Sequence, residues 1–261
     1  MTGFDAQQAA AALLRLRRGK RQVISAFPGT MRPATLAEGI ATQVALAGLL
    51  GAATPAGFKI GATTEQMRDY LGLPHPIAGF MPEASLHGSG STLNMAPFLQ
   101  PGVECELAVH LVRNLPPGPC SPDQAAAAVG ELMAGIEVVE NRYAGLAAIG
   151  APALVADQVF HAAAILGTPY REWRSLDLAA LPGRMLVDGA VVGEGRGGDL
   201  LGGPMQALAW LAGSAEAAAF GGLRAGQMVM LGSVTPPIWL DRPGTIEVQF
   251  PPLPPVMLTF V

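Results

Sequence analysis

The chain has 261 residues, of which 50% are hydrophobic and 14% are charged, so it has ample material for a buried core and is not intrinsically disordered. Its net charge of −4 provides no general attraction to nucleic acid or to anionic lipid. Two cysteines cannot by themselves build a disulfide scaffold or a zinc site.

The N-terminal segment predicts helices. Residues 5–19 are rich in alanine, leucine and arginine and predict a helix that ends at Gly19. The basic residues follow the first apolar stretch, which is not the order of a signal peptide, so we expect a cytoplasmic protein. Thr35 and Glu38 have the spacing of a capping box and therefore open a second helix.

The second helix lies in a stretch of the sequence without charges, between Glu38 and Lys59. The stretch is nominally long enough to cross a bilayer, but polar residues and glycines dilute it. We therefore expect no membrane partner and a buried helix with Ile40, Val44 and Ala47 on one stripe.

Short elements follow from residue 58 onward. The sequence predicts a strand at 58–61, a short helix at 63–70 and an irregular loop at 72–90. The clearest strand is 102–113, because its apolar and polar residues alternate. This alternation assigns Cys105 to the core and places Glu104 and Glu106 together on the other face.

The remainder of the chain predicts mainly strands. Helices are expected at 123–133 and 204–213, and the glycine-rich segment 193–198 lacks G-x-G-x-x-G spacing and is expected to be a hairpin loop. Strands are expected at 136–139, 185–187, 190–192, 228–231, 245–250 and 256–261. The fold class is therefore α+β, with a helical region at 1–57 packed closely on a β-rich domain at 58–261.

Three glutamates are candidate metal ligands. Glu104 and Glu106, with a third oxygen donor, have the chemistry to hold Mg²⁺ or Mn²⁺, although a solvated strand face fits the same pattern. Glu137 is flanked by apolar β-branched residues and therefore needs a partner. That partner is either a metal ion or a salt bridge, for example with Arg142.

Lysine is scarce in this chain, since Lys20 and Lys59 stand against 14 arginines. Arginine does not give up its proton in proteins, so a lysine is needed where proton transfer matters. Lys59 lies between Phe58 and Ile60, an apolar setting that fits an acid/base group as well as a chance lysine reaching the surface.

Several other classes of site lack their motifs. There is no H-E-x-x-H, no G-x-S-x-G and no P-loop, and the scattered aromatic residues form no platform for bases. No histidine–carboxylate pair is apparent near the 102–113 strand, which argues against C–C bond hydrolysis.

A series of short motifs runs in one order along nearly the whole chain. The motifs are P-A-T-L-A-E at 33–38, K-I-G-A-T-T at 59–64, P-I-A-G at 76–79, E-C-E-L-A at 104–108, E-V-V-E-N-R at 137–142, A-D at 156–157, A-L-A-W-L-A at 207–212, R-A-G at 224–226 and G-S-V-T-P at 232–236. Together they resemble the 2-keto-4-pentenoate hydratase / 4-oxalocrotonate decarboxylase family of the fumarylacetoacetate-hydrolase-like superfamily. Each motif is weak alone, and their shared order makes the resemblance specific.

The resemblance implies a β-roll core and a homo-oligomer that uses Mg²⁺ or Mn²⁺. It assigns the metal to Glu104, Glu106 and Glu137, and proton transfer to Lys59. It also implies a catalytic role for Glu83 and substrate contacts for Leu71, His161, Ser233 and Thr235.

The implied reaction adds water to a 2-keto-enoate of the 2-hydroxypenta-2,4-dienoate type in aromatic meta-cleavage catabolism, giving a 4-hydroxy-2-keto acid. Decarboxylation of a 2-oxo-3-enedioate is the alternative, and a complex with a sister enzyme or a non-catalytic partner subunit is a third. The chain departs from the family pattern at Glu83 and from Gln158 to His161, where Phe160 is expected to narrow the pocket and disfavour a charged substrate tail.

Overall fold

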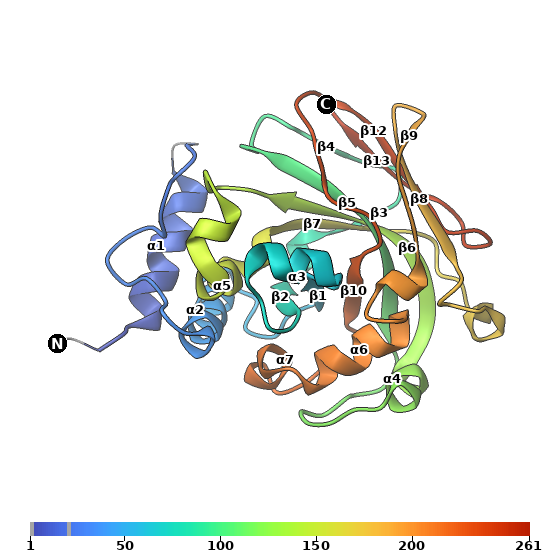
Figure 1. Ribbon diagram of the computed structural model, residues 1–261, viewed down its shortest axis with the longest axis horizontal. Coiled ribbons are helices and arrows are strands. Elements are labelled where there is room, and N and C mark those ends of the chain that lie inside the picture. Colours follow the sequence, from blue (N-terminus) through green and yellow to red (C-terminus); the bar gives the residue numbers. More distant parts are fainter. Residues whose placement is uncertain (1–2, 20–21) are drawn as a thin grey trace.

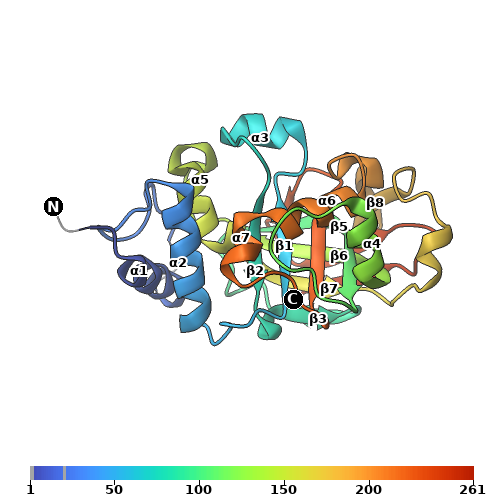
Figure 2. The same ribbon diagram turned by 90° about the horizontal axis from the view of Figure 1, so that it is seen from below.

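The computed structural model describes residues 3–19 and 22–261 and shows the expected α+β architecture (Figure 1). Helices α1, α2 and α5 gather at one end, and the rest consists of two curled mixed sheets with the helices α3, α4, α6 and α7 beside them (Figures 1 and 2). The helices are α1 Ala6–Arg18, α2 Leu36–Leu49, α3 Glu65–Leu71, α4 Pro122–Ala128, α5 Leu146–Ala156, α6 Pro204–Gly213 and α7 Ala215–Ala219. Within the described residues, none of the helices has the length and apolarity needed to cross a membrane.

The larger sheet has eight strands in the order β2-β1-β10-β5-β6-β7-β3, with β11 also pairing with β5. The smaller sheet has five strands in the order β4-β13-β12-β8-β9. The strands are β1 Gly57–Gly61, β2 Ile77–Met81, β3 Leu86–Gly88, β4 Ser91–Leu93, β5 Pro101–Leu111, β6 Val129–Glu140, β7 His161–Leu166, β8 Pro182–Val187, β9 Ala190–Arg196, β10 Met228–Ser233, β11 Ile238–Trp239, β12 Gly244–Gln249 and β13 Val256–Phe260.

The N-terminal helices begin where the capping residues predict. The Thr35 hydroxyl accepts from the Glu38 backbone N–H at 3.2 Å, and the Glu38 carboxylate accepts from the Thr35 N–H at 3.1 Å. The predicted apolar stripe of α2 is partly wrong, because Ile40 and Val44 are only half-buried. The buried face instead carries Gln43, whose amide bonds the backbone of Ala78, Phe80 and Val155 and so ties α2 to β2 and α5.

Three regions differ from the sequence prediction, and in the first two tertiary burial outweighs local pattern. The expected loop at 72–90 contains β2, whose five residues are all buried and therefore show no alternation. The expected helix at 123–133 ends at Ala128, since Val129 begins a 12-residue strand that pairs along β5. The glycine-rich 193–198 segment is largely strand β9, and the hairpin turn lies at Asp188 and Gly189, both at positive φ.

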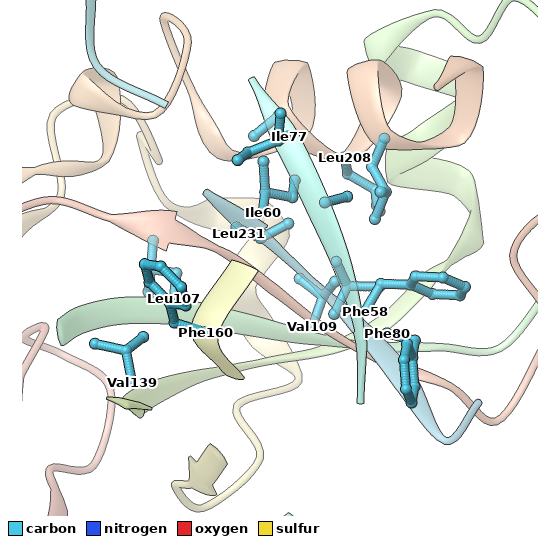
Figure 3. Packing of buried hydrophobic residues seen from close by; sticks show 14 of the residues in the cluster. Phe58, Ile60, Ile77, Phe80, Leu107, Val109, Val139, Phe160, Leu208 and Leu231 are labelled. Atoms are coloured by element: carbon cyan, nitrogen blue, oxygen red, sulfur yellow. The ribbon is translucent and has the colours of Figure 1, made fainter. Parts of the chain in front are cut away.

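The two faces of β1 have opposite environments. Phe58 and Ile60 face the apolar core (Figure 3). There Phe58 packs edge-on against Phe220, with ring centroids 5.5 Å apart. Lys59 alternates with them and faces the other way. It lies in one cross-strand row with Met230 of β10 and Ala108 of β5, and this row continues to Met133 of β6.

A buried ion triad joins α1 to the end of α5. The Asp157 carboxylate is fully buried and accepts from Arg17 at 2.6 Å and from Arg142 at 3.2 Å. Burial alone would raise the pKa of Asp157, but Arg142 and Arg17 outweigh it and hold the pKa below its ordinary value. The salt bridge considered between Arg142 and Glu137 is therefore not formed, because Arg142 pairs with Asp157.

We expect Asp157→Asn to lower the free energy of unfolding by about 3–5 kcal/mol at pH 7, since it leaves two buried guanidinium groups without their carboxylate. The folded-state pKa of Asp157 is depressed, so its contribution is present above the unfolded value of about 3.9 and disappears as the pH falls through the folded value. Urea unfolding of both proteins at pH 7 and pH 3 measures this. Asp188→Asn, in the exposed Asp188–Arg242 ion pair, is the control and should lower the free energy of unfolding much less.

Candidate functional site: a buried carboxylate cluster

Three glutamates from two neighbouring strands meet at one point of the larger sheet. Glu104 and Glu106 lie two residues apart on β5, and β6 pairs Glu137 directly opposite Glu104. One carboxylate oxygen from each of the three lies within 4.8 Å of the others. The antiparallel register therefore brings together all three glutamates that the sequence nominated as metal ligands.

Lys59 is the cation of this cluster. Its side chain is 2% exposed, and its Nζ lies 3.0 Å from Glu137 Oε2. Burial alone would lower the pKa of Lys59, but attraction to Glu137, Glu104 and Glu106 outweighs burial and raises it. The other lysine, Lys20, lies outside the described residues.

The three carboxylates differ in how strongly neighbouring positive or hydrogen-bonding groups stabilise their charged forms, and their pKa values shift accordingly. Burial would raise the pKa of Glu137, but Lys59 and His161 lower it below its ordinary value. Burial, together with Glu137 and against the attraction of Lys59, raises the pKa of Glu104 to about 7. Burial and the two neighbouring carboxylates raise the pKa of Glu106 well above its ordinary value. One lysine is therefore too little positive charge for three carboxylates.

Glu106 carries the clearest sign of a missing cation. Its Oε2 accepts from the Gly232 backbone N–H at 2.9 Å, whereas its buried Oε1 has no hydrogen-bond partner within the described chain. Gly232 has φ +104°, and a Cβ there would lie 2.4 Å from Thr63, so only glycine fits this approach. An unpartnered buried carboxylate oxygen is costly, and a hard divalent cation is the ligand that three carboxylates suit. The residues present therefore fit Mg²⁺ or Mn²⁺.

A cavity of about 490 Å³ opens onto Glu104. Ser233 and Thr235 line it, as the resemblance implies, and the buried Thr235 Oγ1 has no partner among the described residues. Leu71 does not line it; Met67 and Tyr70, which precede it on α3, do. Glu83 is exposed at the start of a 3₁₀ turn, Glu83–Ser85, and does not line the cavity either.

His161 and Phe160 lie elsewhere than expected. The buried His161 does not line the cavity; its Nδ1 lies 2.9 Å from Glu137 Oε1. Contrary to the sequence prediction, a histidine–carboxylate pair is therefore present beside β5, so C–C bond hydrolysis is not excluded by the lack of such a pair. Phe160 packs against the Tyr143 ring at 5.5 Å and is not part of the cavity wall, so it does not decide which substrate tail fits.

Sequence reasoning missed Ser85, Gly232, Met67 and Tyr70 as residues of the site. Met67 and Tyr70 lie three residues apart on a predicted helix, so their shared face was a usable signal. Gly232 belongs to the G-S-V-T-P motif beside two nominated residues. Ser85 approaches His161 from a distant part of the chain, and no local pattern marks such a contact.

The sequence matches the family described as fumarylacetoacetate (FAA) hydrolase C-terminal over residues 53–261, which is most of the chain. The chain belongs to this family. The 2-keto-4-pentenoate hydratase of Burkholderia vietnamiensis is 32% identical over 204 residues, which cover 78% of this chain and 77% of that protein. The 4-oxalocrotonate decarboxylase of Pseudomonas putida is 27% identical over 205 residues, with the same coverages.

Solved structures of family members share the fold. The 4-oxalocrotonate decarboxylase from Pseudomonas putida G7, complexed with magnesium and adipate, superposes over the whole of both chains with a TM-score of 0.87 at 23% identity. The fumarylpyruvate hydrolase from Pseudomonas aeruginosa, in complex with Mn²⁺ and pyruvate, has a TM-score of 0.57 at 15% identity over 78% of this chain and 88% of that one. At these identities the likeness establishes the architecture, and the chemistry rests on the residues of this chain.

We expect Mn²⁺ to raise the melting temperature of the wild-type protein, because the ion relieves repulsion among the three carboxylates. Glu106→Gln should abolish this rise and, without metal, melt at or above the wild-type temperature, since the amide has no charge to bury and its oxygen can still accept from the Gly232 N–H. Differential scanning fluorimetry with and without Mn²⁺ measures both effects. The control Glu194→Gln, at an exposed position of β9, should respond like the wild type, and a full Mn²⁺ response in a Glu104/Glu106 double Gln variant would contradict the assignment.

Proposed function

We propose that this protein is a divalent-metal-dependent hydratase that adds water to a 2-keto-enoate of the 2-hydroxypenta-2,4-dienoate type. The observation that supports it best is the cluster of Glu104, Glu106 and Glu137 with Lys59, which meets a cavity at Glu104. The hydratase relatives in the same family support the reaction class. The product is a 4-hydroxy-2-keto acid.

Glu104, Glu106 and Glu137 would hold Mg²⁺ or Mn²⁺. When bound, such an ion supplies Lewis-acid stabilisation for the negative charge that develops on a keto oxygen. Lys59, whose ammonium group lies 3.0 Å from Glu137 Oε2, holds a proton at Nζ for the interconversion of the 2-hydroxydienoate and the 2-keto-enoate. Water then adds across the double bond of the 2-keto-enoate, with its hydroxyl going to C4 and its proton to C3. The apolar row of Met230, Ala108 and Met133 beside Lys59 keeps bulk water from the ammonium group.

The cavity wall favours a substrate with an uncharged tail. Its charged lining residues, among those described, are the acidic Glu104 and Asp199, and no lysine, arginine or histidine lines it. The second carboxylate of a dicarboxylic substrate would therefore find no cationic partner in the wall. Uncharged groups of Met67, Tyr70 and Pro237 are available instead. This supports the dienoate over the 2-oxo-3-enedioate of the alternative decarboxylase, whose relatives carry the same family fold.

Two further expectations stay predictions. The division into a helical region at 1–57 and a catalytic domain at 58–261 is supported by the position of α1 and α2 before β1. A homo-oligomer, or a complex with a sister enzyme, also awaits a direct measurement of assembly.

Lys59→Arg should keep a positive charge beside Glu137 yet reduce kcat by at least about 100-fold, because arginine does not release its proton. Turnover of 2-hydroxypenta-2,4-dienoate in the presence of Mg²⁺, followed by its ultraviolet absorbance, measures the loss. Mn²⁺ binding by the variant serves as the control for an intact metal site. Activity within a few-fold of the wild type would limit Lys59 to an electrostatic role.

We expect the wild-type protein with Mg²⁺ to convert 2-hydroxypenta-2,4-dienoate to 4-hydroxy-2-oxopentanoate and to release no CO₂ from a 2-oxo-3-enedioate. Nuclear magnetic resonance identifies the products from both substrates. Release of CO₂ from the diacid would instead support the decarboxylase, and no turnover of either substrate would support a partner subunit.

A charge placed in the cavity wall tests the reason for this preference. Gln66 lines the cavity from the exposed side of α3, so Gln66→Arg adds a cation without disturbing the core. We expect it to improve binding of the diacid, measured as its inhibition constant, by about tenfold relative to the dienoate. Gln66→Met, of similar length and without charge, is the matched control. It should leave the affinity for the diacid relative to the dienoate unchanged.

A further inference from the structure

Both nitrogens of the His161 ring are engaged inside the protein. Nδ1 lies 2.9 Å from Glu137 Oε1, and Nε2 lies 2.8 Å from Ser85 Oγ. Ser85 is itself held, because its Oγ lies 2.8 Å from the Pro82 carbonyl oxygen. The exposed fractions of His161 and Ser85 are 2% and 8%. A ring held at both nitrogens and buried away from the cavity contacts Glu137 rather than a substrate.

A β-bulge places His161 on the face of Glu137. Strand β7 pairs Ala164 with Glu137 and Ala163 with Val138, but His161 with Val139, so Ala162 has no partner. In regular alternation His161 would share the opposite face with Ala163. The extra residue turns the imidazole to the site face, which is a common use of bulges near active sites.

The turn before His161 has a strained backbone, and it too helps to place the imidazole beside Glu137. Gln158, Val159 and Phe160 all have positive φ, between 50° and 63°, a conformation that is rare for any residue with a side chain and most of all for a β-branched one. Gln158 is held by hydrogen bonds from Arg17 and to the Phe80 carbonyl, at 2.7 Å and 2.6 Å. Backbone strain of this kind persists where surrounding contacts enforce it, and it clusters at functional sites.

The two oxygens of Glu137 are thereby given different partners. Oε1 is taken by His161, and Oε2 faces Lys59 at 3.0 Å. We propose that His161 is a positioning residue that occupies Glu137 Oε1, so that the carboxylate offers Oε2 alone to the metal site and to Lys59, and that Ser85 holds His161 in place. The proposal rests on the proposed function in one respect, the role of Glu137 as a metal ligand.

Mn²⁺ affinity of the purified full-length protein, measured by calorimetry without substrate, tests this role. His161→Leu removes the donor to Glu137 and should weaken Mn²⁺ binding by about 10–100-fold, the usual effect of losing a partner of a metal ligand. His161→Asn places an amide N–H near the position of Nδ1 and should restore the Kd to within about threefold of wild type. Ser85→Ala keeps the ring and should give a smaller loss than His161→Leu.

The metal-free melting temperature of each variant separates positioning from packing. A purely structural role predicts a lower melting temperature with an unchanged Kd, and that result would overturn the proposal. Equal losses of affinity in His161→Leu and His161→Asn would also overturn it, because the N–H donor would then be irrelevant. If His161→Leu does not fold, the comparison of Ser85→Ala and His161→Asn with wild type decides. Normal Mn²⁺ binding without turnover would contradict the hydratase function alone, since the Kd comparison requires no substrate.

Discussion

The arrangement of charges around Glu137 governs the rest of this structure. A carboxylate with no exposed surface is tolerated only if other groups stabilise it, and here Lys59 does so by its charge and His161 by a hydrogen bond, from two different strands. Glu104 and Glu106 add two more carboxylates, and burial together with the neighbouring carboxylates raises the pKa of each. The cluster is therefore poised for a cation, and the surrounding strands, turns and glycines keep its members at fixed positions.

The larger sheet fixes the positions of these charged side chains, because the strands that carry them have an apolar core face and a face directed to the site. The face of β1 with Phe58 and Ile60 is anchored in the apolar core, so the alternating Lys59 has no freedom to leave the site face (Figure 3). The long pairing of β5 with β6 sets Glu104 opposite Glu137. A one-residue change of register would move one of these carboxylates to the apolar face, so the register itself is part of the site.

Buried polar contacts also connect the site to the helical end of the molecule. Asp157 is bound by Arg17 of α1 and by Arg142, and the next residue, Gln158, is bound by Arg17 as well. Gln158 begins the left-handed turn that leads to His161. The helical N-terminal region therefore supports the turn from which His161 reaches Glu137.

The sequence by itself determined the family, the α+β class and the capping box of α2, because these depend on the order and local spacing of residues. It also nominated Glu104, Glu106, Glu137 and Lys59, from their sequence settings and from the family resemblance. Glu104 and Glu106 share a face because side chains alternate along a strand. The spacing of Thr35 and Glu38 is that of a capping box and predicts the start of a helix. Other features were decided by the tertiary structure. Strand β2 is buried on both faces and has no pattern, and the bulge at Ala162 reverses the face that alternation assigns to His161. The partners of Glu137 and Arg142 depend on which strands and helices meet, and local spacing carries no information about contacts between residues far apart in the chain.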